Sequence, residues 1–233
     1  MATKVEVEVE TRFGDLEMLF AVAPFDQAKT AIESAGGKLA TAQQVAQARI
    51  LAGRGYNESQ YSSWVAENFV YFPNGKILVT HAENSPILKH SAEATEAHRN
   101  GIEFHISEEE AASLKRLAKS GEVYTLKQTE SYEIPIKKFA KNRLARFLFG
   151  DVTADYANLI QKAYVDEVPV RLVGSKYQKE QKAPFAQALW LRCVNFRSGL
   201  GGDWGLDYDF YGTRGVRKLS TTQKSAGIAN TYE

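Results

Sequence analysis

The chain has 233 residues, 44% of them hydrophobic and 24% charged, with a formal net charge of +1. This is the composition of a globular chain long enough to bury a core without cross-links, and the balanced charge argues against a nucleic acid or an anionic membrane as the partner. The only cysteine, Cys193, excludes an intramolecular disulfide and a zinc site built from cysteines.

The N-terminal stretch 1–13 predicts neither a signal peptide nor a membrane anchor. It alternates charged residues with valine and lacks an apolar core, and no apolar run elsewhere reaches membrane-spanning length. If the protein acts outside a cell, we expect it to leave by another route, inside a virion or displayed at a cell surface.

The first third of the chain predicts a strand hairpin followed by a helix. Residues 4–10 (K-V-E-V-E-V-E) alternate with a period of two, which is typical of a strand with one solvated face, and a second strand is expected over 17–22. Pro24 opens a helix whose apolar residues recur on one face, and the pair Gly36-Gly37 ends it.

A second helix and a hairpin are expected next. Thr41 is a suitable N-cap, with Gln44 in the capping-box position three residues later, and Gly53 ends the helix. Over 68–82, two apolar runs flank Pro73-Asn74-Gly75, which is a strong hairpin signal.

The middle of the chain predicts mainly helices. After a strand over 102–106, a helix over 107–121 begins at a capping serine and ends at a glycine, and 123–126 is extended. A proline opens a basic amphipathic helix over 135–149, and a further helix is expected over 153–165.

The final third predicts strands over 168–173 and 188–196, where β-branched and aromatic residues gather. An order of strands, helices, a central group of strands, more helices and a late strand indicates an α+β domain rather than a βαβ repeat. We interpret the whole chain, 1–233, as one domain in which 107–173 is a helical insertion.

The tail from Leu191 to Arg217 has an unusual composition. It contains no Lys, Glu, Gln or Met, although these four make up roughly a quarter of the rest of the chain, and it is rich in Gly, Asp, Arg and aromatic residues. Aromatic and Arg side chains supply much of the energy at protein interfaces, and antibody loops favour Tyr, Ser, Gly and Asn. A Gly-rich loop that simply packs on the body is the competing interpretation.

Three segments resemble one family. Residues 24–49, with A-G-G-K-L-A-T-A-Q-Q-V-A, look like the paired-helix entry of C-type-lectin-like folds. Residues 212–217 (G-T-R-G-V-R) resemble the terminal strand of the formylglycine-generating branch of that fold, and 189–196 (L-W-L-R-C-V-N-F) resemble the strand before its ligand-facing loops. Together they are similar to the variable proteins of diversity-generating retroelements, including those of archaeal viruses. The segment 107–173 matches no part of this family.

The resemblance implies an origin for the composition of the tail. In that family a reverse transcriptase mutates adenines, chiefly in asparagine codons that end in a pyrimidine, and such codons cannot become Lys, Glu, Gln, Met or Trp. Trp190 and Trp204 would then be scaffold positions, as Arg214 and Arg217 are also expected to be. Cys193 fits either a variable position or a small buried hydrophobic one.

The resemblance therefore implies a non-enzymatic protein whose hypervariable region, 190–217, recognises a protein or glycan ligand on a cell or particle surface, as in host recognition, without a cofactor. The first and last strands would pair, and Leu206, Tyr208 and Phe210 would be exposed apolar groups. The expected ligand-contacting residues are Leu191, Cys193, Asn195, Arg197, Ser198, Gly201, Asp203, Gly205, Asp207, Tyr208, Asp209 and Phe210.

The residues give little support to a metal site or a phosphate site. The four histidines lack the i, i+4 spacing of a helical zinc site and are typical of surface or capping positions. The aspartates at 203, 207 and 209 suggest calcium, but the D-x-D-x-D-G loop and the Glu-Pro-Asn or Gln-Pro-Asp tripeptide of sugar-binding lectins are absent. The tail glycines match no phosphate-binding loop. We expect no metal.

Two alternative functions stay open. A formylglycine-generating enzyme on the same fold needs a reactive cysteine pair, which one cysteine cannot supply, and another chemistry on the fold would need a concave pocket with perturbed ionisable groups. The basic helix 136–149 could contact nucleic acid or an anionic surface, although a solvated face opposite a packed one is the usual meaning of such a helix.

Overall fold

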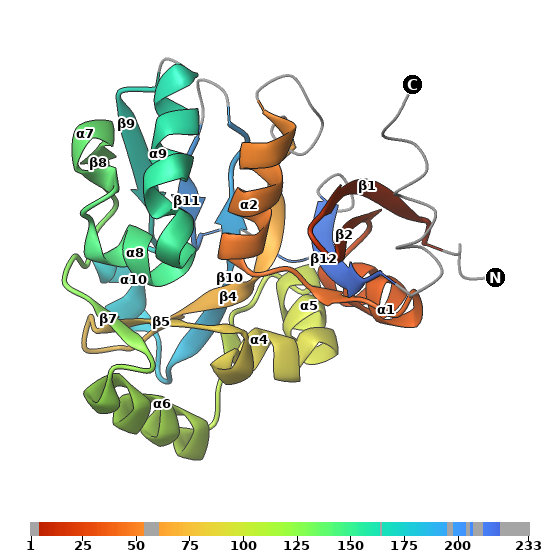
Figure 1. Ribbon diagram of the computed structural model, residues 1–233. Helices are drawn as coiled ribbons and strands as arrows, with labels where there is room; N and C mark the ends of the chain where they lie inside the picture. The colour runs from red at the N-terminus through yellow and green to blue at the C-terminus, as the bar shows by residue number, and fades with distance from the viewer. Residues whose placement is uncertain are drawn as a thin grey trace, which may run out of the picture.

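The computed structural model describes residues 5–53, 61–163, 165–194, 198–203, 206 and 212–219. Within this part of the chain, strands join in one 12-stranded mixed sheet that runs through the middle of the molecule (Figure 1). Its main path is, in spatial order, β1 (Val7–Phe13), β2 (Leu16–Val22), β12 (Gly212–Lys218), β4 (Ser63–Tyr71), β10 (Phe185–Leu191), β11 (Leu200–Gly201), β9 (Glu167–Arg171) and β8 (Tyr132–Pro135). The short strands beside this path are β3 (Lys38–Leu39), β5 (Ile77–Thr80), β6 (Phe104–His105) and β7 (Tyr124–Leu126).

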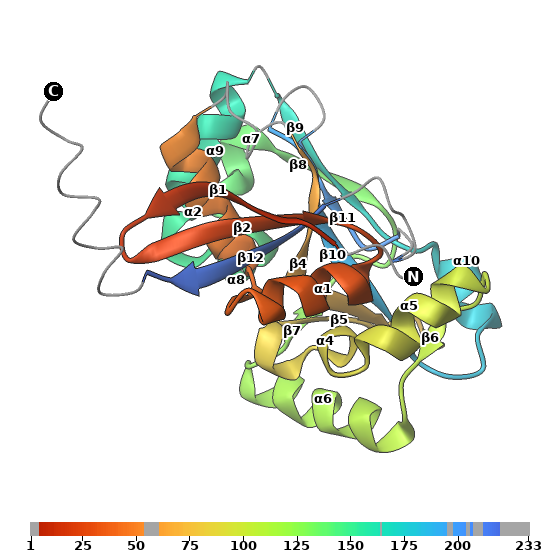
Figure 2. The same ribbon diagram turned by 90° about the vertical axis from the view of Figure 1, so that its right-hand side faces the viewer.

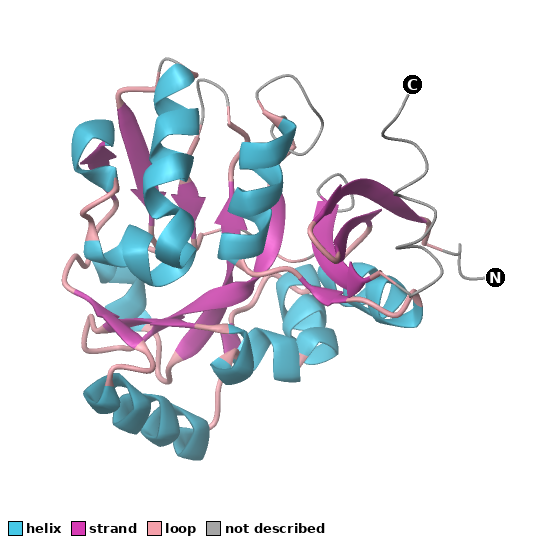
Figure 3. Cartoon of the chain, viewed as in Figure 1, coloured by secondary structure: helices cyan, strands magenta, loops and turns pink. Residues whose placement is uncertain are grey.

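Helices cover both faces of the sheet (Figure 3). One face is covered by α2 (Ala42–Ala52), α7 (Ile136–Phe139), α8 (Arg143–Phe149), the short turn η2 (Gly150–Val152) and α9 (Thr153–Lys162). The other is covered by α1 (Phe25–Ser34), η1 (Ala82–Asn84), α4 (Pro86–Lys89), α5 (Ser91–Arg99) and α6 (Glu108–Ser120), while α10 (Ser175–Glu180) follows β9. Among the described helices, none is long and apolar enough to cross a bilayer.

The strands β4 and β10 form the buried centre of the molecule, and every residue of both is buried. Successive side chains of a strand point to opposite faces. In β4 the odd-numbered apolar residues therefore enter the hydrophobic cluster under α2, α8 and α9, and the even-numbered ones enter the cluster under α1, α4 and α6. Because both faces are covered, these strands carry mostly apolar side chains on both faces, and their polar residues, such as Glu67, Asn68 and Gln187, are buried as well.

The last strand, β12, lies between the first hairpin and β4. It runs antiparallel to β2, with Gly212 opposite Val22, and parallel to β4, with Gly212 opposite Ser63. Helix α1 packs against β2 and β12 (Figure 2). The expectation that the first and last strands pair is wrong, because β2, the second strand of the first hairpin, lies between β1 and β12 and pairs with both.

Two glycines of β12 are required by close packing. A Cβ atom on Gly215 would lie 2.3 Å from the Ile32 side chain and 2.8 Å from the Lys38 carbonyl oxygen, and one on Gly212 would lie 1.7 Å from the Phe20 ring. These separations are shorter than van der Waals contact, so the glycines of G-T-R-G let α1, β2 and β3 approach β12.

The local signals for helix and turn formation are confirmed. Thr41 Oγ1 accepts a hydrogen bond from the Gln44 N–H at 3.2 Å, and Gln44 Oε1 accepts one from the Thr41 N–H at 3.0 Å, which completes the capping box of α2. Ser107 caps α6, and Gly121 ends it in the left-handed conformation. The hairpin of β4 and β5 turns at residues 73–75.

Several predicted boundaries are wrong. The basic helix over 135–149 is two short helices, because the chain turns after α7 and the Asn142 side chain caps a new helix, α8. The strand over 102–106 is reduced to the two residues of β6, the late strand ends at Leu191, and β1 extends to Phe13. Helices α4, α5 and α10 had no clear sequence signal. Tertiary packing sets these boundaries, because a short segment is a strand only where a neighbouring strand forms hydrogen bonds with it.

The segment 107–173 contains strands as well as helices, and both kinds of element pack with the rest of the domain. Its strands β7 and β9 pair with β5 and β11 of the same sheet. Its helices α8 and α9 contribute to the same hydrophobic cluster as α2. That this segment is an insertion into a smaller domain stays a prediction.

Two buried arginines, Arg49 and Arg214, hold the chain at Tyr61, and Arg214 also joins the first and last strands. Arg214 of β12 forms a bidentate ion pair with Glu10, with Nε–Oε2 and Nη2–Oε1 distances of 2.6 and 2.8 Å. Its Nη1 donates to the Tyr61 carbonyl oxygen at 3.1 Å, and Nη2 of Arg49 in α2 donates to the same oxygen at 3.0 Å. Both guanidinium groups therefore fix the chain just before β4.

Replacing Arg214 with methionine should lower the free energy of unfolding by about 3–5 kcal/mol, because the buried Glu10 carboxylate would lose its cation. The Glu10 side chain is only 5% exposed. Arg99→Met is the matched control: Arg99 pairs with Glu96 on the surface of α5, and losing that pair should cost less than about 1 kcal/mol. Urea unfolding followed by circular dichroism measures both, and equal losses would contradict a structural role for the buried pair.

Candidate functional site

The predicted variable region lies at one end of the central sheet. Leu191, the last residue of β10, pairs with Ser63 on one side, and Gly212, the first residue of β12, pairs with Ser63 on the other. Residues 192–211 therefore connect two strands that lie on either side of a single residue of β4, and within this segment β11 pairs with β10 on the other side of β10 from β4. Because neighbouring strands lie ~4.8 Å apart, the ends of this segment are separated by about 10 Å.

The start of the segment is held through its main chain. The Arg192 carbonyl oxygen accepts a hydrogen bond from Arg49 Nη1 at 2.8 Å, and the Cys193 N–H donates to Ser62 Oγ at 3.2 Å. The Arg192 N–H donates to the Gly199 carbonyl oxygen at 2.9 Å, which joins the two ends of the stretch 192–199. These contacts use backbone atoms of the segment and do not depend on which side chains it carries.

The return of the segment is anchored in the same manner. The Gly202 N–H donates to the Arg171 carbonyl oxygen at 2.9 Å, and Tyr71 Oη donates to the Gly202 carbonyl oxygen at 2.8 Å. The Leu206 carbonyl oxygen accepts from the Phe25 N–H, at the first turn of α1, at 3.0 Å. Hydrogen bonds to the rest of the fold therefore hold the segment both near its start and after β11.

Of the predicted ligand-contacting residues that the structure describes, two reach the surface: Asp203 is exposed and Cys193 is half-buried. Leu191 and Ser198 are 1% and 2% exposed, and Gly201 is buried in β11. Leu191 joins the hydrophobic cluster under α2, and the Ser198 hydroxyl donates to the Cys193 carbonyl oxygen. The prediction of surface contact is corrected for these three positions, because their side chains or backbone belong to the packed scaffold.

The remaining predicted contacts lie outside the described residues, and their role stays a prediction: Asn195, Arg197, Gly205, Asp207, Tyr208, Asp209 and Phe210, together with the expected scaffold residue Trp204. Leu206, which was expected to be exposed, is fully buried. It packs in the cluster that contains Trp64 and Trp190. The expectation was wrong because Leu206 lies in the same cluster as Phe25 of α1, whose N–H donates to its carbonyl oxygen.

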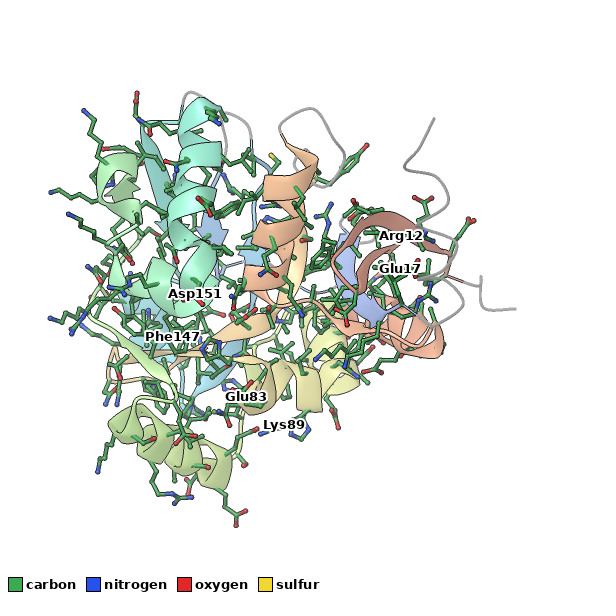
Figure 4. All side chains as sticks on the ribbon, viewed as in Figure 1. Arg12, Glu17, Glu83, Lys89, Phe147 and Asp151 are labelled. Carbon is green, nitrogen blue, oxygen red and sulfur yellow. The ribbon has the colours of Figure 1, made fainter. Side chains whose placement is uncertain are left out.

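The expected scaffold residues that the structure describes are held by side-chain contacts, which agrees with that expectation; that they do not vary stays a prediction. Trp190 is 3% exposed and packs edge-on to Trp64, with ring centroids 5.1 Å apart. Arg217 Nη2 donates to Glu17 at 2.6 Å, and Arg12 lies beside Glu17 on the first hairpin (Figure 4). The hydrogen bond from Arg217 holds the pKa of Glu17 below its ordinary value, against the opposing effect of burial.

An apolar surface beside the ends of the segment was missed from the sequence. Tyr61 is 52% exposed and stacks on Phe20, with centroids 6.1 Å apart. The Arg214 guanidinium lies 5.0 Å from the Phe20 centroid, and Val22, opposite Gly212, is 49% exposed. Apart from Gly212 and Arg214, these residues lie outside the biased tail, so only the pairing of β2 and β4 with β12 reveals them.

Asp203 lies near two positive charges, those of Arg192 and Arg171. Partial burial of its carboxyl group raises its pKa, and the positive charges of Arg192 and Arg171 only partly offset that effect. A carboxylate that has lost part of its hydration gains more from a ligand cation than a fully hydrated one. The position therefore suits charge-selective contact.

The basic residues of 136–149 lie on the solvated side of α7 and α8. The exposed ones are Lys137, Lys138, Lys141, Arg143 and Arg146, whereas Phe139, Leu144, Leu148 and Phe149 are buried. Phe147 stacks on His81, with ring centroids 4.0 Å apart. This contact uses an aromatic ring that could otherwise stack on a base. The arrangement matches a solvated face opposite a packed one rather than a nucleic-acid surface.

No group of three or more His, Cys, Asp or Glu side chains in the described part of the chain is placed to hold a metal ion. His81 lies 3.9 Å from Glu67, and His90 lies 3.6 Å from Glu93. Each of these histidines therefore has its own acidic neighbour, and they do not gather at one point.

Comparisons with known proteins bear on the fold. No protein-family model matches the chain, and no curated protein matches it. A solved structure described as "Accommodation of massive sequence variation in Nanoarchaeota by the C-type lectin fold" is similar, with a TM-score of 0.60 and 15% sequence identity over 88% of this chain and 96% of that chain. The chain accordingly has a C-type lectin fold of the α+β class.

Gly202→Ala should destabilise the protein by about 1–3 kcal/mol, because the new Cβ would lie 2.3 Å from the Phe69 ring and 2.6 Å from Tyr71 Oη. Gly174→Ala is the control. Its Cβ would approach no atom more closely than 3.9 Å, so its effect should stay within about 0.5 kcal/mol. Thermal and urea unfolding measure both variants. A tolerated Gly202→Ala would mean that this glycine belongs to the exchangeable positions and not to the scaffold.

Proposed function

We propose that the protein binds ligands through the segment 192–211, whose exposed side chains vary while a fixed scaffold holds its main chain. The observation that carries this proposal is the geometry at Ser63, where both ends of the segment join the sheet. Hydrogen bonds from Arg49 and to Ser62 hold its first residues through backbone atoms. A segment fixed in this way can exchange solvent-facing side chains without loss of its shape.

The ligand we propose is a protein or glycan on the surface of a cell or particle. Asp203, with Arg171 and Arg192 near it, supplies charges of both signs, and Tyr61 and Val22 add exposed apolar area. Mixed charge beside aromatic area is typical of recognition surfaces. No catalytic step is part of this proposal, since one cysteine cannot supply the reactive pair that the formylglycine-generating branch needs.

We further propose that a retroelement diversifies the tail. Mutation of asparagine codons would leave a stretch without Lys, Glu, Gln and Met, as in Leu191–Arg217. A protein of similar fold from Nanoarchaeota is described as accommodating massive sequence variation, which supports this reading. Buried positions such as Ser198 and Leu206 would be kept constant by packing.

One library randomises the predicted ligand-contacting positions that are either not buried or outside the described residues. Most of its variants should fold, and the library should yield binders to unrelated ligands. These positions are Cys193, Asn195, Arg197, Asp203, Gly205, Asp207, Tyr208, Asp209 and Phe210. The matched control library randomises Leu191, Ser198 and Leu206, which are buried, and most of its members should fail to fold. Protease resistance of displayed variants measures folding. Equal loss of folded variants in the two libraries would contradict the proposal.

The DNA beside the gene tests the retroelement proposal separately. We expect a near-identical repeat of the codons for Leu191–Arg217, with asparagine codons at the variable positions, and a reverse transcriptase gene close by. Differences between the repeat and the gene should be confined to adenines of the repeat. Sequencing of the source genome measures this, and a repeat that differs equally at all four bases would exclude adenine-directed diversification.

A further inference from the structure

On the side of β10 away from β4, three residues, 187–189, lie between the pairings with two short strands; these residues are called the interval below. On this edge β10 pairs with β6 at Phe185 and Ala186, and with β11 at Trp190 and Leu191. Positions 187–189 lie between these pairings. Two acids flank the interval, since Glu103 comes directly before β6 and Asp203 follows two residues after β11.

A buried side-chain acceptor lies at this interval without a partner. Gln187 is 4% exposed, and its Nε2 donates to Glu103 Oε2 at 2.5 Å. Its Oε1 is buried and accepts no hydrogen bond. Leaving a buried acceptor unsatisfied costs free energy, and such atoms usually mark a missing donor. The amide group therefore needs an N–H or O–H group that the described chain does not provide.

No ion pair joins Glu103 to Lys, Arg or His in the described residues, and His105 is the positive group whose charge acts on its carboxylate. Its hydrogen bonds come from the neutral groups of Gln187 and Tyr177, and burial raises its pKa above the ordinary value for glutamate. Glu17, in contrast, is paired with Arg217 and has a lowered pKa. The difference indicates that Glu103 is a partly desolvated carboxylate whose charge is not balanced by an ion pair within the described part of the chain.

Aromatic side chains border the same interval. Tyr177 is 43% exposed and stands edge-on to Phe185, with centroids 6.2 Å apart, and the exposed His105 does the same at 6.3 Å. The negative charges of Asp203 and Glu103 both act on the buried hydroxyl of Tyr71, whose pKa is raised mainly by burial. The two acids therefore border one small region of the molecule.

We propose that Glu103, Gln187 and Tyr177 form a recognition site for a guanidinium group of a ligand. A guanidinium is planar and carries five N–H donors in a fixed fork, so it can donate to the half-buried Glu103 carboxylate, and it reaches Gln187 Oε1 as well when the side chains that cover this buried atom move aside. Tyr177 is 43% exposed and hydrogen-bonded to Glu103, so its ring is near enough to contact the same cation. A metal ion fits less well, because two acids and one amide oxygen supply too few ligands for a hard cation. The three residues lie outside the tail, so this proposal stands apart from the variability of 192–211.

The test uses the full chain and n-butylguanidinium, followed by the side-chain amide signals of Gln187 in ¹H–¹⁵N NMR spectra. The wild-type protein should show a saturable shift of these signals. Glu103→Gln keeps the shape of the side chain but removes its charge, and it should weaken the apparent affinity by about tenfold or more. Glu180→Gln is the matched control, because Glu180 is an exposed acid near Tyr177 on α10, and it should change the affinity by less than about twofold.

A neutral probe and a peptide complete the experiment. n-Butylurea has similar N–H groups but no charge and should bind at least about tenfold more weakly than n-butylguanidinium. Equal binding of both probes, equal affinity of the wild type and Glu103→Gln, or the absence of any saturable shift would overturn the proposal. A short peptide with one arginine distinguishes the sources of the guanidinium group: tighter binding than the free probe supports a protein partner, and equal binding supports a small guanidinium compound.

Variants of the tail test whether the site is independent of the segment 192–211. Folded tail variants that bind the probe with wild-type affinity would show that the two sites are separate.

Discussion

The buried ion pair between Arg214 and Glu10 is the interaction on which the rest of the structure depends. Both charges have lost most of their hydration, so each is tolerable only beside the other. The pair joins β12 to β1, and the third contact of Arg214, to the Tyr61 carbonyl oxygen, joins both to the start of β4. The last strand is thereby fixed between two others, and the segment that precedes it must return to a defined point.

That constraint divides the tail into two kinds of position. Glycines 202, 212 and 215 admit no side chain, and Leu206 is buried in the cluster that contains Phe25 of α1. Asp203 and Cys193 lie at or near the surface, where a change of side chain disturbs little of the packing. The unusual composition of the tail therefore has two causes: packing fixes part of it, and the proposed exchange of surface residues accounts for the rest.

The edge of β10 offers a second kind of recognition, built from residues that the proposed diversification would not reach. Glu103 precedes β6, Tyr177 lies in α10, and Gln187 lies in β10 itself. Such a site would hold a common feature of many ligands, while the neighbouring segment would distinguish among them. Binding surfaces that combine a fixed anchor with adaptable contacts gain affinity from the first and specificity from the second.

The sequence alone determined what depends on neighbouring residues: the capping box at Thr41 and Gln44, the hairpin before Lys76, the end of α6 at Gly121, and the biased composition of the tail. It also carried the resemblance from which the C-type lectin fold was inferred. Only the tertiary structure decided that Leu191 and Leu206 are buried, that the basic helix breaks at Asn142, and that Gln187 meets Glu103. The physical reason is that these outcomes depend on contacts between residues far apart in the chain, such as those of Arg214 with Glu10, and the energy of such a contact depends on the burial that the whole fold creates.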